Sequence, residues 1–257
     1  MSRWPPWSEP WGRAPIVGRV DPRRPVGRLG TGRGDPGRWF RTRRGPPSRR
    51  VGSTEDSVDD RRPERRARAD ARLMEAQSVL QALDLLDRWR QFGDPVVVGS
   101  VALDLVVRAD IDLEIYSAAP AAGEGFVVAS ALAGLPKVRE IRYRDSRDKR
   151  EDGLYWKVYY ELAPARTWTV DMWFFAERRR RTGAASMIPS IRAALDDEKR
   201  DTILAIKEQA IEAGSRAHGH WLYRAVLDDG IRSYPDYLAW IGKQDVWERT
   251  TWVSASG

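Results

Sequence analysis

One stretch organises the chain: Val96-Val-Val-Gly-Ser-Val-Ala-Leu-Asp-Leu-Val-Val-Arg-Ala-Asp-Ile-Asp-Leu-Glu-Ile-Tyr116. An apolar run reaches a Gly99-Ser100 turn, and nine residues then precede Asp110-Ile-Asp112. The alternation of apolar and acidic residues after position 109 predicts a half-buried strand. We therefore expect a core strand at residues 96–98, a short helix at residues 101–107 and a second strand at residues 110–116.

The acidic pair Asp110 and Asp112 is the first candidate site. Side chains two apart on a strand point to the same face, and two carboxylates held that close repel each other unless a cation lies between them. Mg²⁺ suits this role, because it binds a few carboxylates and completes its shell with water and phosphates. The Gly99-Ser100 turn offers close backbone approach and a hydroxyl to a phosphate. Together these features predict phosphoryl or nucleotidyl transfer.

A third carboxylate, Asp171, lies in the apolar, aromatic segment Trp168-Thr-Val-Asp-Met-Trp-Phe-Phe175, which predicts a buried strand. An unpaired carboxylate there would cost several kcal/mol. Asp171 therefore needs either a metal ion or a basic partner such as an arginine, and the sequence leaves both open.

These residues resemble the nucleotidyltransferase superfamily related to DNA polymerase beta, whose pattern is an apolar strand, Gly-Ser, a short helix, Asp-x-Asp and a later acid. The resemblance covers roughly residues 79–175, and Ala109 departs from it, because many members carry a serine there. It implies a small mixed α/β sheet with flanking helices. It also implies that Asp110, Asp112 and Asp171 are catalytic residues that bind Mg²⁺, with Mn²⁺ as the second option.

The resemblance further implies that the protein transfers a nucleoside monophosphate from a nucleoside triphosphate, such as ATP, to a hydroxyl acceptor. The acceptor is a small molecule, a protein or an RNA. Gly99 and Ser100 would hold the phosphates. Among many cations, Lys157 is the best phosphate contact, because it lies on a predicted strand beside Tyr155 and Trp156. A non-catalytic binding or regulatory protein and a metal-dependent phosphohydrolase are the alternatives.

Hydrophobic periodicity predicts the remaining elements. Helices are expected over residues 63–91, 125–133, 190–213 (broken near Asp196), 220–227 and 234–241. Strands are expected over residues 137–143 and 154–162, as a hairpin, followed by the Asp171 strand. His218 and His220 are expected to have capping or surface roles rather than to bind a metal.

Composition sets an Arg/Pro/Gly-rich arm and linker (1–62) apart from the rest of the chain. The resemblance implies a nucleotidyltransferase-like catalytic domain over residues 63–182, and a helical C-terminal region is expected over residues 183–257. The first 50 residues hold 13 Arg, no Lys and three acids, so the whole net charge of +7 arises there. They also hold 17 Pro and Gly, a bias typical of disorder. Such an arm could contact nucleic acid nonspecifically. Alternatively, it is an extension upstream of a natural start near Met74. A transit peptide fits less well.

Composition also excludes some classes. The chain has no cysteine, which rules out disulfides and thiolate metal sites. No apolar run approaches the length of a membrane span, and no secretion signal is apparent. We therefore expect a soluble, cytoplasmic protein without a membrane partner.

Overall fold

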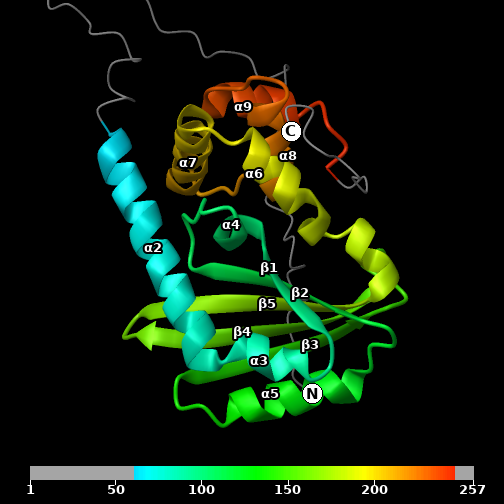
Figure 1. Ribbon diagram of the computed structural model, residues 1–257. Helices are drawn as coiled ribbons and strands as arrows, with labels where there is room; N and C mark the ends of the chain where they lie inside the picture. Colours follow the sequence, from blue (N-terminus) through cyan, green and yellow to red (C-terminus); the bar gives the residue numbers. More distant parts are fainter. Residues whose placement is uncertain (1–60, 247–257) are drawn as a thin grey trace, which may run out of the picture. The chain divides into compact units, whose positions relative to one another are not determined.

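The computed structural model describes residues 61–246 (Figure 1). The predicted disordered arm, residues 1–62, falls almost entirely outside this range. The described part is a mixed α/β fold, as predicted, built on one five-stranded sheet with flanking helices. Within residues 61–246, no helix combines the length and the apolar character needed to cross a bilayer.

The sheet has the order β1-β2-β5-β4-β3. Its strands are β1 (Asp94–Val98), β2 (Asp110–Ser117), β3 (Val138–Ser146), β4 (Gly153–Ala163) and β5 (Arg166–Ala176). The central pair, β2 and β5, is parallel, whereas the other neighbours are antiparallel. The predicted hairpin of β3 and β4 is confirmed.

Helices account for most of the rest. They are α2 (Arg62–Leu83), α3 (Leu85–Arg90), α4 (Gly99–Ala102), α5 (Ala122–Ala133), α6 (Ile188–Ala194), α7 (Asp197–Glu212), α8 (Gly219–Leu227) and α9 (Tyr234–Ile241), with 3₁₀ turns η1 (Glu177–Arg181) and η2 (Ala184–Met187). The break expected near Asp196 is confirmed, because its side chain caps α7 by accepting a hydrogen bond from the Lys199 amide at 2.8 Å.

Two sequence-based predictions need correction. The single helix expected over residues 63–91 is two helices, because Asp84 adopts a left-handed conformation (φ 50°) that ends α2. The helix expected at residues 101–107 ends at Ala102 in the structure. Asp104 there also has a positive φ of 55°, so the chain turns through residues 103–109 before entering β2.

One face of the sheet carries the main hydrophobic core. Its apolar side chains pack against α2, α3 and α5, with Trp89 of α3 at the centre. The Trp89 ring contacts the rings of Trp156 and Phe174 and donates to the Met172 sulfur at 3.2 Å. A second hydrophobic core is formed by side chains of the four helices α6, α7, α8 and α9, together with Ala69 of α2. The opposite face of the sheet combines polar side chains such as Asp112, Asp171 and Lys157 with aromatic rings.

A buried ion pair links α2 to α7. One guanidinium nitrogen of Arg65 lies 2.9 Å from both carboxylate oxygens of Asp201, and Arg62 approaches the same carboxylate at 3.3 Å. The side chains of Arg65 and Asp201 are only 6% and 7% exposed. Removing one partner would leave a buried charge uncompensated.

We therefore expect Asp201→Ala to lower the free energy of unfolding by about 3 kcal/mol, as is typical of a broken buried pair. Asp87→Ala is the control, because it breaks an exposed pair with Arg90 and should cost at most about 1 kcal/mol. Urea denaturation measures both. Equal losses of unfolding free energy in the two variants would show that the buried pair between α2 and α7 stabilises the fold no more than an exposed pair does.

Candidate active site

The three predicted carboxylates lie on the polar face of the central strand pair. Asp110 and Asp112 point to one side of β2, because side chains alternate along a strand. The register pairs Asp112 with Asp171 of β5, which brings the third carboxylate onto the same face. On the other side of Asp171, its register partner in β4 is Lys157.

The Gly99-Ser100 turn lies against this face. Gly99 has a φ of +64°, and a Cβ at this position would collide with the Oδ2 atom of Asp112. Only glycine avoids both the strained backbone and the clash. The turn predicted to hold phosphate therefore adjoins the carboxylate of β2.

Two cations approach the outer members of the carboxylate group. An Arg216 guanidinium nitrogen lies 3.3 Å from Asp110 Oδ2, and Lys157 Nζ lies 3.0 Å from Asp171 Oδ1. The Tyr155 hydroxyl also donates a hydrogen bond to Asp171. The basic partner left open for Asp171 is thus a lysine rather than an arginine. Asp112 lies between these two pairs and forms no ion pair of its own with residues 61–246.

The pKa of Asp112 is raised in this buried, acidic environment. Burial, and then the negative charges of Asp110 and Asp171, raise the pKa of Asp112 to about 7, while Arg216 and Lys157 act in the opposite direction. The three carboxylates are therefore close enough to repel one another.

As the side chains stand, no three acidic or histidine residues within positions 61–246 converge on one point that could hold a metal ion. Asp110 is turned to Arg216 and Asp171 to Lys157. The donor set nevertheless fits a hard divalent cation, since it consists of carboxylates that share one face and destabilise each other's charge. Binding would require Asp110 and Asp171 to exchange their cationic partners for the metal.

Sequence analysis missed Arg216 and Tyr155. Arg216 lies in the loop between α7 and α8, more than 100 residues from Asp110, and its local sequence carries no signal. Tyr155 was seen only as an aromatic neighbour of Lys157. Its phenol bonds Asp171 because β4 and β5 pair in a register that sequence does not reveal.

Glu114 continues the acidic alternation but serves another purpose. Its carboxylate is buried, not solvent-facing, and accepts hydrogen bonds from the amides of Ala184 and Ala185, both at 2.9 Å, and from the Tyr116 hydroxyl. It thereby anchors the start of η2 to the central strand. Glu114 is therefore a structural anchor.

The histidines contribute no site of their own. His218 precedes α8 without a side-chain cap, so the predicted capping role is not seen for it. His220 is half-buried, and burial lowers its pKa to about 4, which keeps it neutral. Its expected surface position is therefore wrong.

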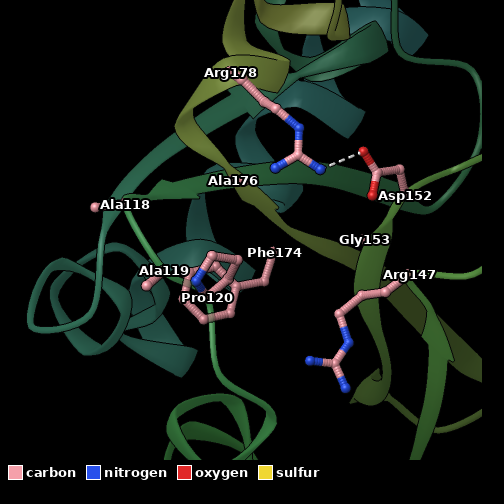
Figure 2. A pocket seen from close by; sticks show the side chains of 9 residues that line it. All are labelled: Ala118, Ala119, Pro120, Arg147, Asp152, Gly153, Phe174, Ala176 and Arg178. Carbon is pink, nitrogen blue, oxygen red and sulfur yellow. Dashed lines mark hydrogen bonds and ion pairs between the residues drawn. The ribbon is translucent and has the colours of Figure 1, made fainter.

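A pocket lies away from the carboxylates, at the end of β2 and beside the β3–β4 tip (Figure 2). Figure 2 shows Arg147 and Arg178 on its rim, with Arg178 bonded to Asp152 at 2.8 Å. None of the six predicted site residues lines it. The candidate site is thus the polar face of the central strands rather than this cavity.

No family model and no curated protein matches the chain. Among solved structures, a cytoplasmic RNA terminal U-transferase shares 17% identity over 61% of this chain and 47% of its own, with a TM-score of 0.45. The Cid1 poly(U) polymerase with Mg and 3′-dATP bound shares 16% over 62% and 48% (TM-score 0.45). Cid1 with its product ApU shares 17% over 72% and 53% (TM-score 0.44).

This chain spans about half the length of those proteins. A similarity at this level carries no argument for an activity, which has to come from the side chains of the site.

The contact of Gly99 with Asp112 predicts a specific cost for a methyl group. Gly99→Ala should lose about 1–2 kcal/mol from the left-handed backbone and a further 1–3 kcal/mol from the clash. Gly214→Ala is the matched control, because its φ is +66° but open space surrounds it. Chemical denaturation compares them. Equal costs, or an excess that survives in an Asp112→Ala background, would contradict the contact.

The raised pKa of Asp112 predicts a pH-dependent gain from Asp112→Asn. Because the folded pKa lies above the unfolded value, the native state loses stability as the pH rises from about 4 to about 7. Without divalent metal, the Asn variant should match the wild type near pH 4 and exceed it by on the order of 2 kcal/mol at pH 8. Thermal unfolding in chelator measures this difference. A variant less stable than the wild type at pH 8 would refute the predicted repulsion.

Proposed function

We propose that this protein is a nucleotidyltransferase that moves a nucleoside monophosphate from a nucleoside triphosphate to a hydroxyl acceptor. One observation carries the proposal: Asp112 and Asp171 are register neighbours on parallel strands, with Asp110 on the same face and the Gly99 turn against Asp112. This arrangement puts a candidate cation site beside a candidate phosphate site. Phosphoryl-type transfer needs little else from the protein than positioning and charge neutralisation.

Asp110, Asp112 and Asp171 would hold Mg²⁺, or Mn²⁺ as a second option. When bound, the metal would neutralise the triphosphate and lower the pKa of the acceptor hydroxyl. The acceptor oxygen would bond to the α-phosphorus as the bond to pyrophosphate breaks. Asp171 would accept the hydroxyl proton.

The two cations of the site would change partners in this cycle. Lys157, now bonded to Asp171, would turn to a phosphate oxygen once substrate is present. Arg216 would release Asp110 in the same way. Gly99 and Ser100 would hold the β- and γ-phosphates through the backbone of the turn and the serine hydroxyl. Both cations would thus stay in the site throughout the cycle and exchange a carboxylate partner for a phosphate.

A second candidate is a non-catalytic binding protein with the same fold. The ion pairs Arg216–Asp110 and Lys157–Asp171 favour it, because they already satisfy two of the three carboxylates. A phosphohydrolase with water as the acceptor is the third candidate. The fate of the label distinguishes the three candidates. A nucleotidyltransferase leaves the label on an acceptor, a binding protein forms no labelled product, and a phosphohydrolase releases labelled free monophosphate.

The test is incubation with α-labelled nucleoside triphosphates, Mg²⁺ and a metabolite extract, with mass spectrometry of labelled products. Asp110→Asn should lower labelling at least about 100-fold while the fold stays intact. Asp104→Asn is the control, because its carboxylate is 46% exposed and lies 4.0 Å from Arg200, outside the group. Unchanged labelling in Asp110→Asn would refute the proposed role.

A further inference from the structure

Arg144 occupies an unusual position on the same sheet face as the carboxylates. It belongs to the edge strand β3, where its register partner is Tyr155 of β4, and Tyr155 in turn pairs with Trp173 of β5. The guanidinium carbon lies 5.4 Å from the centre of the Tyr155 ring and 5.8 Å from that of Trp173. The side chain therefore leans inward over the sheet toward β5 instead of extending into solvent.

The guanidinium of Arg144 has donors without acceptors. Its Nε and Nη2 atoms are buried and find no hydrogen-bond partner within the described part of the chain. Neighbouring arginines of the same hairpin are satisfied: Arg142 donates to Glu140 at 2.6 Å, and Arg147 is bonded to Asp145. The aromatic rings attract the Arg144 cation but offer no lone pair to its N–H groups. Buried charged donors without acceptors are costly, and an anionic ligand would satisfy both of these N–H groups.

The sheet order places Arg144 on one particular side of the carboxylates. The Gly99 turn follows β1, at one edge of the sheet, whereas Arg144 lies on β3, at the other edge. Asp112 and Asp171 lie between them on the central strands. Tyr155, whose ring Arg144 covers, donates its hydroxyl hydrogen bond to Asp171. A ligand of Arg144 would therefore approach Asp171 from the side opposite the phosphate turn.

We propose that Arg144 binds an oxyanion, a phosphate ester or a carboxylate, that the acceptor carries near its reactive hydroxyl. This inference rests on the proposed function, which it deepens by assigning the acceptor to the anionic class. The planar fork of a guanidinium binds such groups through two parallel hydrogen bonds. Stacking on Tyr155 and Trp173 orients that fork before the acceptor arrives. A polycationic acceptor would be repelled.

A binding experiment tests the site without activity, metal or nucleotide. In arginine-labelled full-length protein, the Nε–H resonance of Arg144 is identified by its loss in Arg144→Lys. Inorganic phosphate and acetate are titrated separately, with chloride holding the ionic strength constant. A saturable shift of this resonance with either anion supports the proposal and shows whether phosphate or carboxylate is preferred. A resonance that neither anion moves, or that simply follows ionic strength, overturns it.

Arg142→Gln is the matched control, because Arg142 lies two residues away on the same strand face but is already paired with Glu140. The Arg144 resonance should titrate normally in this variant. Failure of the proposed function is distinguishable from failure of the anion site: unchanged turnover in Asp110→Asn removes the first and leaves this titration as it was.

Kinetics on a labelled acceptor provide the second readout. Arg144→Gln should raise the KM for the acceptor about 10- to 100-fold, as expected for loss of charge-assisted hydrogen bonds, and leave the KM for the nucleoside triphosphate within about twofold. Arg142→Gln should change neither. A selective rise in the KM for the triphosphate, or labelling confined to neutral and cationic acceptors, would overturn the proposal. Thermal unfolding of Arg144→Gln and Arg144→Lys confirms that each variant is folded.

Discussion

Mutual repulsion among three carboxylates is the constraint to which the rest of the site responds. Parallel pairing of β2 with β5 puts Asp171 directly beside Asp112, and alternation along β2 adds Asp110 to the same face. Burial of Asp112, together with the negative charges of Asp110 and Asp171, disfavours its ionised form and raises its pKa to about 7. A divalent cation would remove this tension, and two basic side chains partly relieve it.

The compensating charges come from distant parts of the chain. Lys157 reaches Asp171 from the neighbouring strand, whereas Arg216 reaches Asp110 from the loop between α7 and α8. The helical region therefore contributes directly to the electrostatics of the sheet face. A second basic side chain of this region also contacts the segment that leads into β2. Lys207 of α7 is buried and donates a hydrogen bond to the Leu105 carbonyl at 2.9 Å.

Charge is distributed unevenly across the sheet face. Carboxylates occupy the centre, a glycine turn adjoins them on the β1 side, and an arginine held by two aromatic rings lies on the β3 side. We expect this arrangement to bind the groups of a substrate at different places on the face, according to their charge. In the proposed function, the triphosphate would bind the turn and the metal, and the acceptor would be selected by the residues beyond Asp171. The proposed function and the proposed anion site thus describe two ends of a single surface.

The sequence by itself determined the fold class, nearly all strands and helices, and the candidate site residues. Apolar periodicity and the spacing of Gly99, Asp110 and Asp112 are local patterns, and a single sequence is enough to recognise them. It could not reveal the register of β2 with β5, the pairing of Lys157 with Asp171, or the approach of Arg216 to Asp110. Those contacts join residues 14 to 106 positions apart. They depend on how strands align and helices pack, which no short segment encodes. The break at Asp84 and the early end of α4 were missed for a related reason, because a left-handed residue other than glycine leaves no mark on hydrophobic periodicity.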